Sequence, residues 1–84
     1  MKVKDLKAAL SGFDDEDIVV LAKDGEGNSF SPLADVEASL YSPDNSYRGE
    51  TSARELTAEM VVRGFGEEDI LTGATRSVTL WPTN

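Results

Sequence analysis

The 84-residue sequence contains no histidine and no cysteine, the side chains that most often serve as catalytic base or nucleophile. Its 16 aspartate and glutamate residues leave carboxylate chemistry as the remaining route to catalysis or to cation binding. No motif among them prescribes a reaction. We therefore predict a protein that is not an enzyme and that needs neither a cofactor nor a metal.

The densest acidic run consists of Asp14, Asp15 and Glu16, which Asp17 extends. Consecutive carboxylates can converge on a cation, but a charged run beside a strand is usually a solvated link. We assign Asp14, Asp15 and Glu16 to a binding surface rather than to a metal site.

A second group of polar residues occupies every second position, as the first ligands of a calcium-binding loop do. It consists of Asp24, Glu26 and Asn28. The match ends there, because Ser29 stands where that loop needs glycine and Asp35 where it needs a bidentate glutamate. A turn between strands is the better interpretation, with Asp24 and Glu26 as candidate binding residues on its surface.

Charge is distributed unevenly along the chain. Residues 14–50 hold ten acids and two bases, a net of −8, whereas the remaining six acids and six bases cancel. Such a field repels phosphate backbones, so we expect no direct nucleic-acid binding. It favours a partner with a basic surface, or it serves solubility alone.

The longest apolar run, residues 18–22, is too short to cross a membrane, and no signal peptide is recognisable. We therefore expect a soluble cytoplasmic protein, in the host cytoplasm if a phage encodes it, without membrane contacts.

Three aromatic residues, Tyr41, Tyr47 and Trp81, are candidate anchors of a binding surface, because these side chains combine apolar area with a polar tip. Tyr41 and Trp81 are predicted on the sheet face opposite Val36, Leu40, Val78 and Leu80, at strand ends that are expected near each other. Alternatively, they pack beneath a second helix or in a homodimer interface, since a domain this small needs their burial.

Local patterns in the first part of the chain predict a helix and a strand. Apolar residues recur with helical spacing at Val3, Leu6, Leu10 and Phe13. This stripe favours a helix from about residue 2 to Leu10, ended by Gly12 in the left-handed conformation. The aliphatic run Ile18–Leu21 favours a central strand, from about Asp17 to Lys23, that is covered on both faces.

The return strand is predicted from alternating residues between Asp35 and Tyr41. It is expected to begin near Ser29, and Pro32, which lacks an amide donor, is expected either to interrupt the pairing or to force a bulge there. Residues 47–51 show no pattern and are interpreted as irregular.

A second helix is predicted from the capping-box spacing of Ser52 and Glu55, with its end near Arg63 at the Gly64 turn. Residues 76–81 alternate as the last strand.

The order helix, strand, strand, helix, strand predicts one small α+β domain over residues 1–84. The sheet is expected to be antiparallel and three-stranded, with the N-terminal helix on one face and the second helix before the last strand. Its other face is covered either by residues 52–63 or by another chain, so a homodimer is one expected assembly.

Four stretches share a pattern with a known group of proteins: the helix Val3–Leu10, the link and strand Gly12–Leu21, the turn Asp24–Asn28 with Ser31–Leu33, and the ending Val78–Asn84. In these stretches the sequence resembles small uncharacterised acidic proteins encoded by tailed phages and prophages, whereas residues 47–74 depart from their pattern. The resemblance implies a setting, since such proteins often bind host machinery or host defence proteins and do not act as catalysts.

We therefore expect a phage-type accessory protein that binds a host protein, as a counter-defence inhibitor would, through an acidic surface with aromatic anchors. The alternative is an oligomeric protein that sequesters a nucleotide signal, with an aromatic ring on the base and Arg48, Arg54 or Arg76 on phosphate. That alternative requires the arginines to converge, because the field of the chain otherwise repels phosphate.

Overall fold

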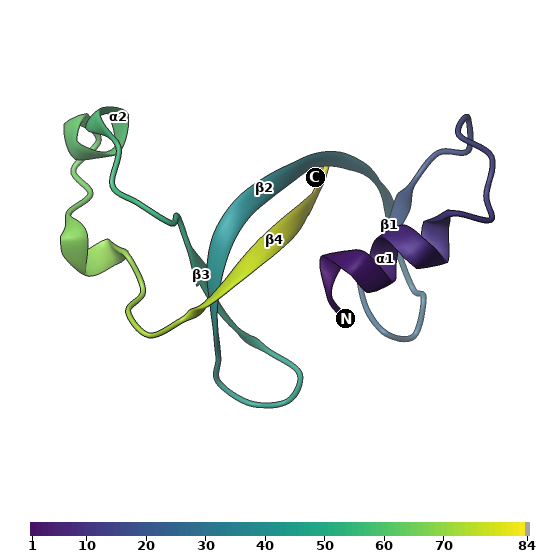
Figure 1. Ribbon diagram of the computed structural model, residues 1–84, viewed down its shortest axis with the longest axis horizontal. Helices are drawn as coiled ribbons and strands as arrows, with labels where there is room; N and C mark the ends of the chain where they lie inside the picture. Colours follow the sequence, from purple (N-terminus) through teal and green to yellow (C-terminus); the bar gives the residue numbers. More distant parts are fainter. Residues whose placement is uncertain (84) are drawn as a thin grey trace. The chain divides into compact units, whose positions relative to one another are not determined.

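The computed structural model describes residues 1–83 and shows a small α+β fold (Figure 1). Its elements are α1 (Val3–Leu10), β1 (Val20–Ala22), β2 (Phe30–Pro43), β3 (Gly49–Ser52), α2 (Ala58–Val62), the 3₁₀ helix η1 (Glu67–Asp69) and β4 (Thr75–Pro82). Asn84, the last residue of the stretch used for the resemblance, lies outside the described residues. The predicted class is confirmed, with an N-terminal helix, antiparallel strands and a short helix before the last strand.

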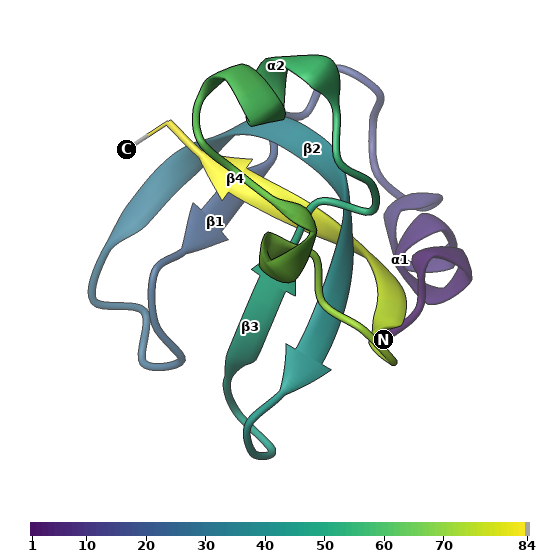
Figure 2. The same ribbon diagram turned by 90° about the vertical axis from the view of Figure 1, so that its left-hand side faces the viewer.

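Strand β2 is the centre of the sheet. Its first residues pair antiparallel with β1, which sets Val20 opposite Pro32, and its last residues pair antiparallel with β3, which sets Leu40 opposite Ser52. The last strand, β4, also pairs with β2 and runs beside it in Figures 1 and 2. Among the described residues the sheet therefore has four strands, one more than predicted.

The chain forms two compact units. The first consists of Met1–Asp35 together with the chain from Leu80 onward, and the second of Val36–Thr79. Helix α1 and strand β1 belong to the first unit, whereas β3, α2 and η1 belong to the second. Strands β2 and β4 contribute residues to both.

The prediction of a central first strand covered on both faces is wrong. Strand β1 has three residues and lies at the edge of the sheet. The aliphatic residues that enter it are exposed, with 82% of Ile18 and 49% of Val20 accessible. In the preceding turn the Asp17 amide donates to the Asp14 carbonyl, and the residue register with β2 begins only at Val20, after Ile18.

Helix α1 confirms the predicted helix, but its end differs from the prediction. Gly12 is not among the glycines with positive φ, and the C-cap residue Ser11 stays right-handed. The Ser11 hydroxyl donates to the Ala8 carbonyl oxygen at 2.7 Å, which satisfies an acceptor at the helix end without a left-handed glycine. The left-handed ending does occur after α2, where Gly64 has φ of 97°.

The predicted interruption at Pro32 is also wrong, because β2 continues through it. The amide of the following residue, Leu33, donates to the Val19 carbonyl at 2.9 Å, so the pairing with β1 does not need an amide from Pro32. The Pro32 carbonyl accepts from the Thr83 amide at 3.1 Å on the β4 side.

Residues 47–51, predicted as irregular, contain most of β3. Its short polar sequence carries no strand pattern, and pairing with β2 alone makes it a strand. Ser52 ends this strand and does not cap a helix. Its hydroxyl donates to the Ala53 carbonyl and accepts from the Leu71 amide, each at 3.0 Å. Helix α2 begins after Thr57 instead, whose hydroxyl accepts from the Met60 amide at 3.2 Å.

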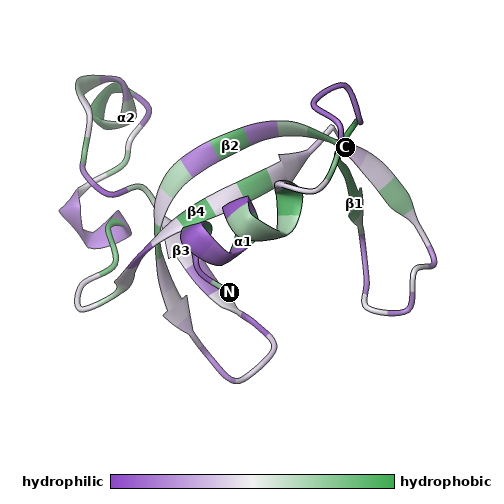
Figure 3. Ribbon diagram, turned by 45° about the vertical axis from the view of Figure 1, so that its right-hand side comes forward, coloured by the Kyte–Doolittle hydropathy of each residue, from purple (hydrophilic) through white to green (hydrophobic). Residues whose placement is uncertain are grey.

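No hydrophobic side chain of the described residues is fully buried. The buried positions are two serines of β2, Ser31 at 3% exposure and Ser39 at 1%. Ser39 Oγ lies 2.7 Å from Ser77 Oγ and 2.8 Å from Thr79 Oγ1 on β4. Hydrophobic residues instead lie along α1, β2 and β4 without forming a buried layer (Figure 3).

Candidate functional site

The structure divides the predicted binding residues between the two units. Tyr41 and Tyr47 belong to the unit with β3 and α2. The unit with α1 and β1 contains the others: Asp14, Asp15, Glu16, Asp24, Glu26 and Trp81. Only the two tyrosines are brought onto one hairpin, β2–β3, whereas the neighbourhood predicted for Tyr41 and Trp81 stays a prediction.

The turn of the β2–β3 hairpin presents Tyr47 to solvent. The side-chain oxygen of Asn45 accepts from the amides of Tyr47 at 3.0 Å and Arg48 at 3.1 Å. Across the turn the Asp44 amide donates to the Arg48 carbonyl at 2.9 Å. These bonds fix the backbone on both sides of Tyr47, and 84% of this residue is exposed. The hairpin therefore holds an aromatic side chain outward on an ordered turn.

Tyr41 has a different position in the same hairpin. It is half-buried in β2 opposite Thr51, and its ring lies against Gly49. A Cβ atom added to Gly49 would stand 2.5 Å from the Ser42 carbonyl oxygen and 2.7 Å from the Tyr41 hydroxyl oxygen, so any larger residue would force the hairpin backbone or the ring to shift. Tyr41 thus packs along the hairpin backbone, while Tyr47 offers its surface to a partner.

Trp81 lies near the end of β4 and is 45% exposed. The chain around it is fixed by the bond from the Thr83 amide to Pro32 and by the 3.0 Å contact between the hydroxyls of Ser31 and Thr83. Trp81 therefore offers a partly exposed indole on an anchored strand end.

The acidic residues Asp14, Asp15 and Glu16 are exposed and form a turn rather than a cluster around a cavity. Asp14 Oδ1 accepts from the Glu16 amide at 2.9 Å. An aspartate that accepts from the amide three residues earlier occurs at three places in the described chain: Lys2–Asp5 at 2.8 Å, Asp14–Asp17 at 3.2 Å and Gly66–Asp69 at 2.8 Å. In the acidic run, the carboxylates of Asp14 and Asp17 therefore serve to hold the local turn.

The loop from Asp24 to Asn28 uses its carboxylate in the same way. Asp24 Oδ1 accepts from the amides of Glu26 at 2.9 Å and Asn28 at 3.2 Å, and Oδ2 accepts from the Asn28 side chain at 3.1 Å. These donors, the Asn28 amide first, hold the pKa of Asp24 below its ordinary value of 3.8. Within residues 1–83, no three or more aspartate or glutamate residues are arranged so that they could hold a metal ion.

One hollow brings together two arginines that the sequence leaves far apart. This arginine hollow, of about 540 Å³, is lined by Ala38, Ala53, Arg54, Glu55, Thr57 and Arg76. Arg54 is held in place, since its Nε donates to the Ser39 carbonyl at 3.1 Å and its Nη2 to the Ser77 carbonyl at 2.8 Å. Arg48 does not line the hollow. No sequence motif marks the structural role of Arg54.

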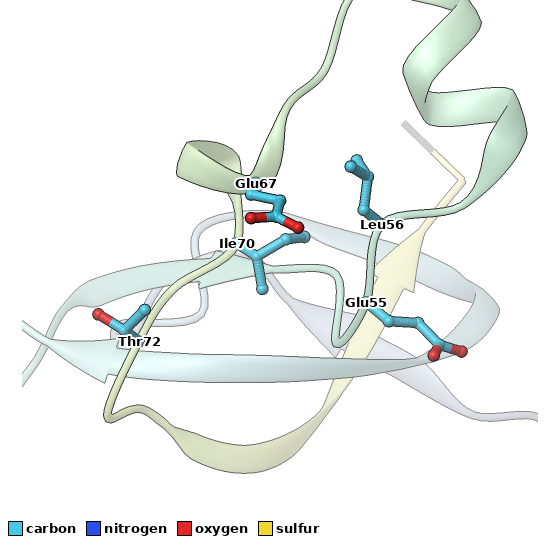
Figure 4. Close-up of a pocket in the computed structure, with 5 residues that line it drawn as sticks. All are labelled: Glu55, Leu56, Glu67, Ile70 and Thr72. Atoms are coloured by element: carbon cyan, nitrogen blue, oxygen red, sulfur yellow. The ribbon is translucent and has the colours of Figure 1, made fainter.

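A second hollow, of about 280 Å³, is lined by Glu55, Leu56, Glu67, Ile70 and Thr72. Figure 4 shows the Glu67 carboxylate beside Ile70, whereas the Glu55 carboxylate points away from Glu67. The two carboxylates therefore do not face each other as an acid and base pair would.

Comparison with known proteins assigns no family to the chain. No family model matches it, and no curated protein and no solved structure is significantly similar to it. In the described part of the chain, the helices are too short and too polar to cross a lipid bilayer.

Proposed function

We propose that the protein acts by binding another protein, with Tyr47 as the central contact residue. The observation that carries this proposal is the exposure of Tyr47, 84%, on a turn whose backbone is held by the Asn45 side chain. A large side chain that stays exposed on an ordered turn loses little conformational freedom on binding, and tyrosine is enriched among the residues that dominate interface energies.

Charge indicates the kind of partner. Residues 14–50 carry a net charge of −8, and Asp44 and Glu50 lie on either side of Tyr47 in sequence. Both are exposed, as are Asp14, Asp15, Glu16, Asp24 and Glu26. A basic surface on the partner would be attracted to such a field before contact is made. The resemblance to phage proteins makes a host protein with a basic surface the partner class that we propose.

Affinity capture from bacterial lysate tests this proposal when the wild type is compared with Tyr47→Ala. A true partner should be retained by the wild type, and the amount retained should fall at least tenfold with Tyr47→Ala. Binding to the wild type should also weaken as the salt concentration rises. The candidate is then purified and its affinity for both forms is measured by calorimetry.

Phe13→Ala is the matched control, because Phe13 is also an exposed aromatic residue, at 68%, but lies outside the hairpin. Capture that is equally reduced by both substitutions would indicate nonspecific hydrophobic adsorption. A partner that binds Tyr47→Ala as tightly as the wild type would contradict the role proposed for this residue.

A second candidate function is binding of a nucleotide signal in the arginine hollow. It is favoured by the presence of Arg54 and Arg76 on one hollow against a single glutamate, Glu55. The volume of about 540 Å³ is in the range that small ligands occupy. Arg54 keeps its full positive charge after donating to two neutral carbonyl groups, so both arginines attract phosphate.

A thermal-shift screen with cyclic and linear nucleotides tests this second function. A ligand at one hundred times its dissociation constant adds about 2.7 kcal/mol to stability, which is readily measured. Arg76→Gln should abolish the shift, whereas Arg63→Gln, outside the hollow, should preserve it. If no nucleotide shifts the wild type, this candidate is removed while protein binding through Tyr47 is unaffected.

A further inference from the structure

The part of the chain that the structure describes contains two asparagines, and a serine follows each of them. Asn28 precedes Ser29 in the loop between β1 and β2, and Asn45 precedes Ser46 in the turn of the β2–β3 hairpin. Both asparagines are exposed. Asparagine is a chemically labile residue, because the backbone nitrogen that follows it can attack the carboxamide carbon. Since a serine supplies that nitrogen at both sites, we expect their surroundings to decide which of them reacts faster.

The reaction at such a site is intramolecular and needs neither a cofactor nor an oxidant. The serine amide nitrogen gives its proton to hydroxide and forms a bond to the asparagine Cγ atom, which moves negative charge onto Oδ1. The bond between Cγ and Nδ2 then breaks, and Nδ2 takes up a proton from water and leaves as ammonia. Water opens the resulting five-membered imide ring at either carbonyl carbon, which gives aspartate or isoaspartate. In sum, one water is consumed and one ammonia is released.

The surroundings of Asn45 stabilise the charge that forms on Oδ1. This oxygen accepts from the Tyr47 amide at 3.0 Å and from the Arg48 amide at 3.1 Å. Two backbone donors on one carbonyl oxygen are the arrangement of an oxyanion hole, because both bonds strengthen when the oxygen becomes negative. The bond across the turn, from the Asp44 amide to the Arg48 carbonyl at 2.9 Å, helps to hold these donors in place before the attack.

The surroundings of Asn28 have the opposite effect. Its Nδ2 donates to Asp24 Oδ2 at 3.1 Å and makes a longer contact with Glu26 Oε2 at 3.4 Å. Its backbone amide donates to Asp24 Oδ1 at 3.2 Å. Two carboxylates beside the carboxamide repel the negative charge that the attack creates. They also hold the nitrogen that must leave, so the loop slows both steps of the reaction.

We propose that Asn45 is a site of spontaneous deamidation in this protein, activated by the backbone donors of its turn, whereas Asn28 is protected by the carboxylates of its loop. Every group in this argument lies in the same turn or loop as the asparagine on which it acts. The inference therefore depends neither on contacts outside these two segments nor on the proposed function.

Deamidation at Asn45 changes the surface beside Tyr47. Both products carry one more negative charge, and isoaspartate also lengthens the backbone at the residue that orders the turn. The isoaspartate form therefore loses the geometry of the bonds to the Tyr47 and Arg48 amides. A consequence for binding rests on the proposed function: the isoaspartate form should bind the partner more weakly, because Tyr47 is then held on a less ordered turn.

Peptide mapping by mass spectrometry follows both sites in one sample of the whole protein, incubated at mildly alkaline pH. In the folded protein Asn45 should lose ammonia about tenfold faster than Asn28, which corresponds to a difference of about 1.4 kcal/mol between the two barriers. In concentrated guanidinium chloride the ratio of the two rates should approach one. The unfolded chain keeps sequence neighbours such as Asp44 and loses the hydrogen bonds, so this control separates the two influences.

Two variants test the causes separately, and in each the other asparagine serves as the internal standard. Glu26→Gln should speed the reaction at Asn28, because it removes one of the two carboxylates, and should leave Asn45 unchanged. Ser46→Val should slow the reaction at Asn45, because a β-branched side chain crowds the attacking nitrogen, and should leave Asn28 unchanged.

The rates decide the proposal. Equal rates at the two sites of the folded protein would overturn it. An unchanged ratio in guanidinium chloride would overturn it as well, because the sequence neighbours of Asn45 would then set its rate without the turn. If the rates are as expected but the isoaspartate form binds the captured partner as tightly as fresh protein, the deamidation site is supported and only the role of Tyr47 in binding is contradicted.

Discussion

The Nε atom of Arg54 donates a hydrogen bond of 3.1 Å to the carbonyl oxygen of Ser39. The same guanidinium donates through Nη2 to the carbonyl oxygen of Ser77 at 2.8 Å, so one side chain joins β2 to β4. Arg54 follows the end of β3 by two residues. It thereby also fixes the segment that leads from β3 toward α2 to the two longest strands.

Replacement of Arg54 by lysine should lower the free energy of unfolding by about 1 to 3 kcal/mol, because an ammonium group cannot reach both carbonyls with the planar geometry of the guanidinium. Urea titration measures the change. Arg63→Lys is the control, since Arg63 contacts Glu59 at 2.8 Å with both side chains about 70% exposed (68% and 74%). Such a surface pair contributes less than about 0.5 kcal/mol. Equal losses in the two variants would contradict the role assigned to Arg54.

Ser39→Ala should destabilise the protein by about 1 to 2 kcal/mol, because it removes the buried hydroxyl group to which the Ser77 and Thr79 hydroxyls are both hydrogen-bonded. Chemical denaturation of the variant and of Ser46→Ala, an exposed serine in the hairpin turn, checks this expectation. The Ser46 variant should change stability by no more than about 0.5 kcal/mol. If both variants match the wild type, the hydroxyl cluster does not contribute to stability.

Gly64→Ala should cost about 1 kcal/mol or more, because Gly64 has φ of 97° at the end of α2. Its amide donates to the Val61 carbonyl and that of Phe65 to the Met60 carbonyl, each at 3.0 Å, which completes a Schellman ending. Gly12→Ala should be neutral or stabilising, since Gly12 lacks positive φ and has no atom within 4 Å of an added Cβ. Thermal unfolding of the two variants separates these outcomes.

The elements that sequence reasoning predicted well depend on local signals. The helical spacing of Val3, Leu6 and Leu10 is sufficient for α1, and the alternation of residues 76–81 is sufficient for β4. The glycine ending was predicted at both Gly12 and Gly64, and only Gly64 adopts it. At the end of α1 the Ser11 hydroxyl donates to the Ala8 carbonyl oxygen instead. The position of a glycine in the sequence does not reveal this alternative.

The elements that sequence reasoning missed depend on contacts between distant residues. Strand β3 is polar and exists because the turn at Asn45 returns the chain to β2. The apolar run at Ile18 predicted burial, but burial requires a second layer that neither unit supplies. Among the site residues, the outward position of Tyr47 follows from the Asn45 side chain. Arg54 and Arg76 line one hollow because β4 pairs with β2 and Arg54 donates to a carbonyl of each strand. No spacing pattern in a single sequence predicts either the position of Tyr47 or the hollow that Arg54 and Arg76 share.

The turn at Asp24 should make stability depend on pH below the ordinary aspartate range. The pKa of Asp24 is lowered from 3.8 in the folded chain, first by the Asn28 amide, so the folded state favours the ionised carboxylate. Its contribution to stability is therefore complete above the unfolded pKa of 3.8 and is lost as the pH falls through the lower folded value. A carbon-detected NMR titration of the Asp24 carboxyl group measures this folded pKa directly.

Asn28→Ala should raise the pKa of Asp24 toward 3.8, because it removes the side-chain donor at 3.1 Å. The backbone bond from residue 28 remains available to the variant, so a partial return is expected rather than a complete one. Ser29→Ala, next to Asn28, leaves every donor to the Asp24 carboxylate in place and should keep the wild-type pKa. A titration in which Asn28→Ala and the wild type coincide would show that the carboxamide does not stabilise the ionised form.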